Sequence, residues 1–325
     1  MPPLLSVEGL RVSINRAGDE RVVVNGIDLT VDEGEALVLV GESASGKSLI
    51  ACGVVDLLSP GARVVGGRTV FEGHVLQDLP DADWRRLVGM GIGVMLQDAI
   101  GSLYPMDLIG LQSGEVLGAH GEELSQEEVA ERVHDAFGEV ALPKRRMMGA
   151  YADEVSRGQA QRAMLAAALL SAPRLLIADE PLSGLDVTVA QQVLALIDDL
   201  RRKRGMGLLL VTHDMAVAAG VADRVAVVYG GAIVEEGPVD EIFFRPKHPY
   251  TAGLLGSVPG LGLGRLRPIE GEAPDLFELP RGCSFANRCE FAVDRCRLET
   301  PVARPVGSVS VACHRAEELS LVGVG

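Results

Sequence analysis

Short runs of apolar residues alternate with amphipathic stretches along most of the chain, and glycine-rich turns separate them. Continuous apolar runs of this length are typical of strands buried on both faces of a sheet. They cover residues 36–40, 92–97, 175–178 and 208–211. Patterns typical of helices lie between them, at residues 48–58, 158–171 and 187–202. Strands that alternate with helices predict a mostly parallel α/β sheet.

The remaining segments have other patterns. Residues 4–31 and 63–79 indicate further strands, with Asn25-Gly26 as a predicted turn, and residues 225–234 predict a hairpin. Residues 98–155 lose strand character, and we expect a mainly helical insertion there because Ser125 and Glu128 have the spacing of a capping box. After about residue 246 the chain becomes rich in Gly and Pro, so that a separate, small C-terminal domain is expected.

The segment after the first buried run is rich in glycine. It reads Gly41, Glu42, Ser43, Ala44, Ser45, Gly46, Lys47, Ser48. Glycines allow successive N–H groups to point inward, and the helix that follows places its positive N-terminus beside a phosphate chain. Lys47 can reach the β- and γ-phosphates, and Ser48 offers a hydroxyl to Mg²⁺. The pattern therefore predicts a nucleotide site, and the alternative is a chance glycine-rich turn.

Polar residues follow the other buried runs. Asp179 can hold Mg²⁺, directly or through water, and Glu180 can orient and polarise the attacking water. His213 could donate a hydrogen bond to the γ-phosphate, and the amide of Gln97 could contact Mg²⁺ or that water. Because parallel strands present their carboxyl ends at one edge of a sheet, we expect these side chains to lie near the phosphate loop. Taken alone, the acidic pair would more often be an ordinary loop after a strand, and a lone histidine is usually a surface or structural residue.

Composition restricts the class of protein. The chain has 325 residues, enough for a large core and more than one domain. Its net charge of −15 argues against a nucleic-acid-binding surface. No uncharged apolar stretch reaches the roughly 18 residues of a membrane span, and the N-terminus does not resemble a signal peptide. We therefore expect a cytosolic protein.

Four of the five cysteines gather near the C-terminus: Cys283, Cys289, Cys296 and Cys313. In a reducing compartment such a group suggests a metal more than disulfides. The spacing is not the paired CxxC of a zinc ribbon. Four thiolates suit a [4Fe–4S] cluster, which is the prediction, with zinc or no metal as alternatives.

Taken in order, these motifs resemble the ATP-binding subunit of ABC transporters over roughly residues 4–245. The resemblance implies that residues 41–48 are the Walker A loop, Gln97 the Q-loop glutamine, Asp179 the end of the Walker B strand and His213 the switch histidine. In this family the Walker A loop of one subunit faces the signature of a second subunit across the nucleotide. The resemblance also implies that residues 155–159 are the signature and residues 183–186 the D-loop. It therefore implies further nucleotide contacts from these two segments, at Ser156, Arg157, Gly158, Gln159 and Asp186.

The tail narrows the resemblance to the oligopeptide, dipeptide and nickel importer subfamily. Residues 245–251 look like the segment after its ATPase core, and residues 282–289 are similar to its cysteine-bearing C-terminus, which also suggests the cluster. We therefore expect an ABC-type nucleotide-binding domain at 1–245, with a helical subdomain at about 98–160, and a C-terminal domain at 246–325. The implied fold is a RecA-like P-loop α/β core with an N-terminal antiparallel β layer, a helical subdomain and the cysteine-rich domain.

Two positions depart from the family pattern. Arg157 stands where glycine is usual in the signature, and a side chain there could crowd the phosphate or require a backbone angle that only glycine adopts readily. We therefore expect an asymmetric ATPase heterodimer with one degenerate site. Residues 11–24 contain no aromatic residue to stack on adenine, so that Ile14 or Arg16 would pack on the base, with weaker base discrimination and some use of GTP.

The resemblance implies a subunit that binds and hydrolyses ATP, with Mg²⁺, to power the import of di- or oligopeptides. Nickel or another small solute is the alternative cargo. Expected partners are a second, homologous ABC ATPase, two transmembrane permeases and an extracytoplasmic solute-binding protein, without nucleic acid. The expected place is the cytoplasmic face of the plasma (inner) membrane, bound peripherally. Alternative functions are a soluble ABC-type ATPase acting on nucleic acid or ribosomes, and a nucleotide-binding regulatory subunit with little hydrolysis.

Overall fold

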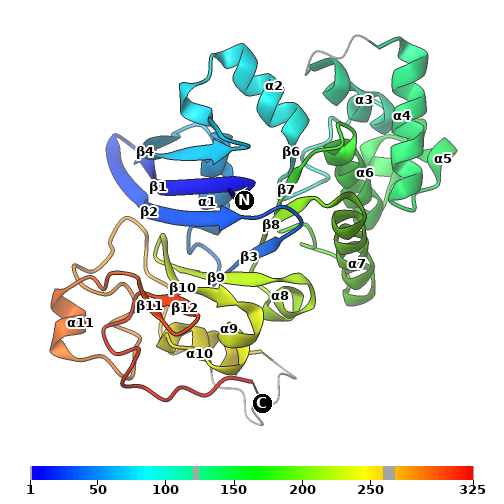
Figure 1. Ribbon diagram of the computed structural model, residues 1–325. Coiled ribbons are helices and arrows are strands. Elements are labelled where there is room, and N and C mark those ends of the chain that lie inside the picture. Colours follow the sequence, from blue (N-terminus) through cyan, green and yellow to red (C-terminus); the bar gives the residue numbers. More distant parts are fainter. Residues whose placement is uncertain (1, 120–123, 259–267, 325) are drawn as a thin grey trace. The chain divides into compact units, whose positions relative to one another are not determined.

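The computed structural model describes residues 2–119, 124–258 and 268–324, which fold into two compact units (Figure 1). The helical unit comprises Met1–Leu4, Val31–Gly34 and Glu72–Leu210. The phosphate-loop unit comprises Leu5–Thr30, Glu35–Phe71 and Val211–Gly325.

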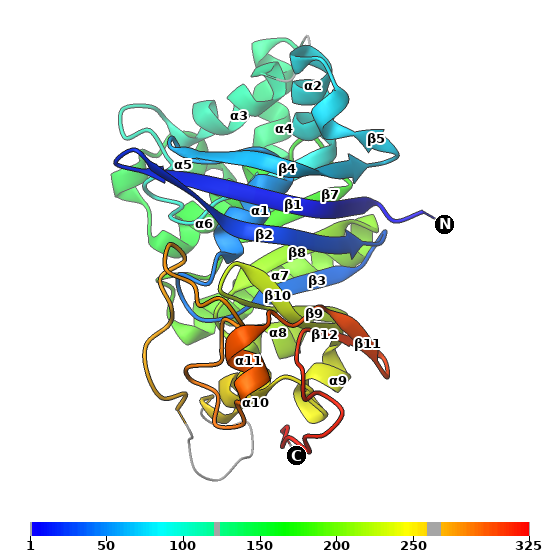
Figure 2. The same cartoon turned by 90° about the vertical axis from the view of Figure 1, so that its left-hand side faces the viewer.

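An antiparallel sheet formed by the N-terminal strands belongs to the phosphate-loop unit (Figure 2). Its central strand β1 lies between β2 and β4, and β1 pairs with β4 in a register that places Leu5 opposite Phe71. The strands are β1 (Leu5–Arg16), β2 (Asp19–Val31) and β4 (Ala62–Phe71). This sheet is the predicted N-terminal β layer.

A second set of strands in the same unit includes β3, the strand that leads into the phosphate loop. Here β3 pairs with β9 in parallel, and β9, β10, β12 and β11 follow one another in antiparallel order. Both sides of β3 are buried, as its continuous apolar sequence requires. The strands are β3 (Ala36–Val40), β9 (Arg224–Tyr229), β10 (Ala232–Pro238), β11 (Arg304–Val306) and β12 (Val309–Val311). The helices are α1 (Lys47–Val54), α8 (Met215–Val221), α9 (Val239–Phe244), α10 (Pro249–Gly256) and α11 (Asp294–Leu298).

The helical unit carries the remaining strands, and β6 pairs with β7 in parallel. Its strands are β5 (His74–Val75), β6 (Ile92–Met95), β7 (Leu175–Asp179) and the first residues of β8 (Gly207–Thr212). Its helices and 3₁₀ turns are η1 (Leu76–Asp78), α2 (Asp81–Gly91), α3 (Ile109–Ala119), α4 (Gln126–Glu139), α5 (Lys144–Met148), η2 (Ala152–Glu154), α6 (Arg157–Leu169) and α7 (Val187–Arg204). The capping box predicted at Ser125 and Glu128 begins α4.

The structure confirms the α/β class, the N-terminal β layer and the run of helices after β6. The turn predicted at Asn25-Gly26 is wrong, because β2 continues through it and the chain turns at Ala17 and Gly18, both at positive φ (53° and 92°). Gly26 supplies a left-handed backbone inside the strand instead (φ 74°).

A separate cysteine-rich domain is not confirmed. The cysteine-bearing tail belongs to the same compact unit as the N-terminal strands, and β12 adds to the edge of β10 with Glu235 opposite Val311. The boundary placed at residue 245 therefore stays a prediction. In the described parts of the chain, no helix combines the length and apolar character that crossing a membrane requires.

Candidate functional site

The phosphate loop connects β3 to α1 and is shaped by its glycines. A Cβ atom on Gly41 would lie 2.2 Å from the carbonyl oxygen of Val228, so that only glycine fits there. Gly46 is the N-cap of α1 with φ 102°, and as glycine it supplies no side-chain cap to the first N–H groups of the helix. These N–H groups suit an anion, because a helix N-terminus carries partial positive charge.

Lys47 is buried at the start of α1, with only 6% of its surface exposed. Its ammonium group donates to the carbonyl oxygens of Gly41 (2.9 Å) and Glu42 (2.8 Å). The loop therefore folds around its own lysine. A polyphosphate in the loop would take over these donors, and Ser48, the next residue of α1, would offer its hydroxyl to Mg²⁺. The loop fits the predicted nucleotide.

The two residues predicted to contact the base differ in their surroundings. Ile14 is half-buried in β1, and Arg16 ends the same strand. The Arg16 guanidinium lies 5.6 Å from the centre of the Phe277 ring and 3.8 Å from the carboxylate of Asp275. Arg16 is therefore engaged with the C-terminal segment, and a contact of Ile14 or Arg16 with a base stays a prediction.

The helical unit presents the acidic pair at the end of β7. Asp179 is buried, with 4% exposure, and Glu180 follows it with a left-handed backbone (φ 48°). Strain of this kind in a residue other than glycine costs about 1–3 kcal/mol and is most often found at functional sites. The Glu180 carbonyl accepts a hydrogen bond from the Ser183 N–H (3.0 Å), which fixes the turn into the D-loop.

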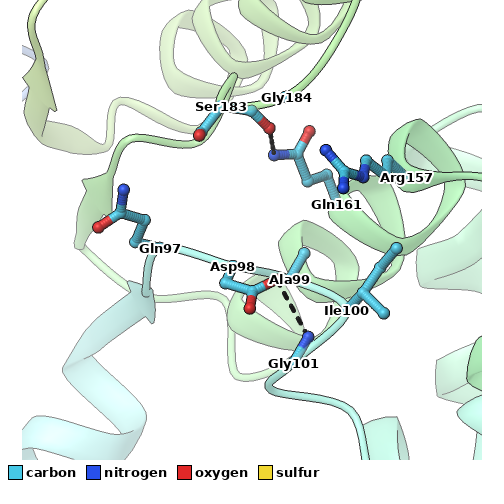
Figure 3. A pocket seen from close by; sticks show the side chains of 9 residues that line it. All are labelled: Gln97, Asp98, Ala99, Ile100, Gly101, Arg157, Gln161, Ser183 and Gly184. Carbon is cyan, nitrogen blue, oxygen red and sulfur yellow. Dashed lines mark hydrogen bonds between the residues drawn. The ribbon is translucent and has the colours of Figure 1, made fainter.

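A pocket of about 570 Å³ brings two predicted residues of the helical unit together, Gln97 and Arg157 (Figure 3). Gln97 and the loop after it line one part, Arg157 and Gln161 of α6 another, and the D-loop residues Ser183 and Gly184 a third. Figure 3 shows the Gln161 amide reaching the Ser183 carbonyl, at 3.2 Å. Sequence reasoning missed Gln161, whose side-chain oxygen is buried without a hydrogen-bond partner in the described chain. Gln161 belongs to none of the sequence motifs, so that the sequence carries no signal for it.

Arg157 adopts an ordinary helical conformation. It is the first residue of α6, after a capping box in which the Ser156 hydroxyl and the Gln159 side chain each bond to the other's backbone N–H. The suggestion that this position needs a backbone angle reserved for glycine is therefore wrong. The exposed side chain lies over the D-loop instead, since a Cβ on Gly184 would lie 2.6 Å from Arg157 Nη1. Gly158 packs against Val189, where a Cβ would come within 2.8 Å.

The last two predicted residues lie at the starts of helices. Asp186 is the N-cap of α7 and accepts a hydrogen bond from the Val189 N–H (3.0 Å). His213 is exposed after β8, just before α8, and belongs to the phosphate-loop unit with Lys47. Gln97, Asp179, Glu180 and the signature belong to the helical unit. That all of them meet at one nucleotide stays a prediction.

The prediction of an iron–sulfur cluster is wrong. Cys283, Cys289, Cys296 and Cys313 do line one small cavity, of about 20 Å³, but no group of His, Cys, Asp or Glu side chains in the described residues could hold a metal ion. The zinc alternative finds no support either. All four are free cysteines.

Burial also changes the acidity of three of these thiols. Burial raises the pKa of Cys283 and Cys313, and that of Cys289 to about 11. His314, next to Cys313, bonds through Nε2 to the carbonyl oxygen of Glu299 (2.9 Å).

Two family models match the chain. The model for "ABC transporter" matches residues 24–183, and the model for "Oligopeptide/dipeptide transporter, C-terminal region" matches residues 234–296. A putative peptide import ATP-binding protein of Brucella ovis is 43% identical over 98% of both chains. The oligopeptide transport ATP-binding protein OppD of Haemophilus influenzae is 40% identical, over 92% of this chain and 93% of its own. The dipeptide transport ATP-binding protein DppD of Bacillus subtilis is 41% identical, over 89% of this chain and 87% of its own.

Solved structures agree on the fold. A dimeric ATP-binding cassette in a post-hydrolysis state, bound to ADP and phosphate, superposes with a TM-score of 0.65. It is 22% identical and covers 72% of this chain and 98% of its own. An ATP-binding subunit of an ABC transporter is 27% identical with a TM-score of 0.59, over 74% of this chain and 91% of its own.

Proposed function

Because this chain belongs to the ABC transporter family of ATP-binding proteins, we propose that it powers the import of di- or oligopeptides through a membrane transporter. The family membership confirms the resemblance found in the motifs. The chain is an ABC ATPase, and this class uses ATP with Mg²⁺ to drive transport. The observation that carries the peptide assignment is the match to the oligopeptide/dipeptide transporter C-terminal region, together with relatives named for peptide import.

Residues from both units have proposed roles in hydrolysis. Lys47 and the N–H groups at the start of α1 bind the phosphates, and Glu180 orients the attacking water. Bound Mg²⁺, held by Ser48, Asp179 and Gln97, would neutralise charge on the β- and γ-phosphates. Catalysis of phosphoryl transfer to water rests on positioning and electrostatic stabilisation, which suits a rigid glycine loop and a strained, fixed Glu180.

We propose that the working ATPase is an asymmetric heterodimer with a homologous subunit. Arg157 supports this, because its guanidinium lies over Gly184 and so changes both the signature and the D-loop surface of this chain. In the family those surfaces face the partner's nucleotide. The site that uses Ser156–Gln159 would then hydrolyse slowly, while the site that uses Lys47 and Glu180 would pair with the partner's intact signature.

The asymmetry has a direct test in the assembled heterodimer. Arg157→Gly should raise turnover at the site formed with the partner's Walker A loop, and Arg162→Gly is a matched control, since Arg162 lies on the same helix and bonds to Gln192 (3.0 Å). Turnover that is unchanged by Arg157→Gly, or raised equally by both, would count against the asymmetry. Single-site turnover can be read by inactivating the other site with Glu180→Gln.

The proposed assembly contains a second ATPase, two permeases and an extracytoplasmic solute-binding protein, with this chain bound peripherally at the cytoplasmic face. Purification of the tagged chain from membranes in mild detergent, with mass spectrometry of the bound proteins, tests this assembly. Recovery of permeases and a solute-binding protein is the expected result, and the ligand of that protein names the cargo. Recovery of ribosomal or DNA-associated proteins without a permease would contradict the proposal.

A further inference from the structure

One ion pair joins the cysteine-bearing tail to the phosphate loop. Arg288 lies between Cys283 and Cys289 in the sequence, and its guanidinium forms a bidentate ion pair with the Glu42 carboxylate. The distances are 2.6 Å from Nη1 to Oε2 and 3.0 Å from Nη2 to Oε1. Glu42 is the second residue of the phosphate loop, so that this pair attaches a segment almost 250 positions away directly to the loop.

Every N–H donor of the Arg288 side chain takes part in a hydrogen bond. Its Nε–H donates to the carbonyl oxygen of Glu270 (3.0 Å), its second Nη2–H to that of Gly271 (3.1 Å), and its second Nη1–H to the Tyr229 hydroxyl (3.4 Å). With the two bonds to Glu42, the five N–H donors of an arginine are all used. The side chain is only 7% exposed. Such a saturated, buried guanidinium holds its partner in one position.

An aromatic cluster supports the same side of the loop. The rings of Tyr229, Tyr250 and Phe285 pack together, with centroids 4.5 to 5.3 Å apart. Phe285 comes from the same segment as Arg288, and the Tyr250 hydroxyl accepts a hydrogen bond from the Glu42 N–H (2.8 Å). Both the backbone and the side chain of Glu42 are therefore fixed by residues outside the loop.

The charge of Glu42 gives this arrangement a consequence for binding. A free carboxylate in a phosphate loop repels a polyphosphate, whereas a carboxylate paired with arginine presents little net charge. We propose that Arg288 is a positioning residue for nucleotide binding, through which the cysteine-bearing tail holds and neutralises Glu42. The proposal rests on the assignment of residues 41–48 as the phosphate site.

Affinities of the full-length chain for Mg·AMP-PNP and Mg·ADP, measured by calorimetry, test the proposal. Arg288→Met should weaken Mg·AMP-PNP binding about tenfold, as the unpaired carboxylate and the loosened loop both oppose binding. Mg·ADP, which carries less charge, should be weakened less. Adding Glu42→Gln to Arg288→Met should restore affinity to within about threefold of the wild type, because the repelling charge is gone.

Rescue separates positioning from a structural role. Arg315 is the matched control, because it ties the same tail together through the Phe291 carbonyl (3.0 Å) and Glu318 (2.8 Å). Arg315→Met should lower thermal stability and leave nucleotide affinity unchanged. Equal losses of affinity in Arg288→Met and Arg315→Met, or no rescue by Glu42→Gln, would overturn the proposal.

Two more variants complete the test. Arg288→Lys keeps the charge but not the bidentate geometry. An affinity about threefold below the wild type is expected, and an unchanged affinity contradicts the proposal. Lys47→Ala should lose nucleotide binding. If Lys47→Ala binds normally, the phosphate site itself is wrong; if it loses binding while Arg288→Met and Arg288→Lys keep it, only the role of Arg288 fails.

Discussion

Glu180 carries the chemistry of the proposed ATPase at the scale of a single residue. It follows the buried Asp179 at the end of β7 and holds a left-handed backbone that few residues other than glycine adopt. The turn is fixed by the bond from the Ser183 N–H to its carbonyl oxygen. A carboxylate on a strained, fixed turn is suited to orienting one water molecule.

Glu180→Gln should keep ATP binding and lower hydrolysis by a factor of about 10²–10⁴, because the amide cannot accept the proton of the water. Single-turnover hydrolysis and nucleotide retention measure the two effects separately. Glu180→Asp, which keeps the carboxylate but shortens it, should retain more activity than Glu180→Gln. Full turnover in Glu180→Gln would remove this residue from the mechanism.

His248 sets a pH dependence of stability. Complete burial lowers its pKa to about 3 from an ordinary value of 6.5, and its Nδ1 accepts a hydrogen bond from the Tyr250 N–H (3.0 Å). Between pH 6.5 and 3 the unfolded chain binds the extra proton, so that the free energy of unfolding should fall by up to about 1.4 kcal/mol per pH unit as the pH decreases. Above pH 6.5 this contribution is fully present.

Denaturant unfolding at several pH values tests this prediction. His248→Asn keeps an acceptor at the N-cap of α10 and should flatten the slope. The neighbouring Glu235 acts in the opposite sense, because burial raises its pKa and favours the folded state at low pH. The wild type and the His248→Asn variant both retain Glu235. An identical slope of the free energy of unfolding against pH in the two proteins would show that His248 does not set that slope.

At the scale of elements, two capping boxes of the same kind begin α4 and α6. Ser125 accepts from the Glu128 N–H and Ser156 from the Gln159 N–H, each at 3.3 Å. The first begins an amphipathic helix of the insertion, and the second begins the helix of the signature. The two capping boxes therefore have the same local geometry, but only the one at Ser156 has a proposed contact with nucleotide.

Ser125→Ala and Ser156→Ala should each lower the free energy of unfolding by about 1 kcal/mol, the usual cost of losing such a cap. Only Ser156→Ala should also lower the ATPase rate of the assembled transporter. Chemical unfolding and ATPase assays check the two effects. An equal effect of both substitutions on activity would remove Ser156 from the nucleotide site.

Elements with a strong local pattern could be predicted from the sequence. The buried strands β3, β7 and β8, the helices α6 and α7, and the glycine loop follow from apolar spacing and glycine positions alone. The turn at Ala17-Gly18 could not be, because Asn25-Gly26 carries the stronger turn signal and the strand absorbs Gly26 in a left-handed conformation. The pairing of β12 with β10 could not be predicted either, because a strand of three residues is too short to show a hydrophobic alternation.

The residues of the candidate site also differ in whether the sequence predicts them. Residues that stand at fixed places in a motif, such as Lys47 and Glu180, could be named in advance. Arg288 and Gln161 could not, because their partners lie far away in the chain and depend on the fold. The metal prediction from the four cysteines failed for a related reason. Spacing shows that the cysteines are near in sequence, but not whether the fold arranges their side chains to hold a metal ion.

At the scale of the whole molecule, the chain has two compact units that carry different parts of the proposed machinery. The phosphate-loop unit holds Lys47, His213 and the tail that fixes Glu42, and the helical unit holds Gln97, Glu180 and the signature. That residues of both units act on one ATP stays a prediction. This division suits an ATPase that converts nucleotide binding into motion for a membrane partner.

The most direct test of the central claim is peptide uptake by the transporter reconstituted in proteoliposomes with ATP inside. The account predicts ATP-dependent accumulation of the peptide bound by the solute-binding protein. That accumulation should disappear when this chain carries Glu180→Gln, although the complex still assembles and binds ATP. Uptake that continues with Glu180→Gln, or ATP hydrolysis without uptake of any peptide, would contradict the account.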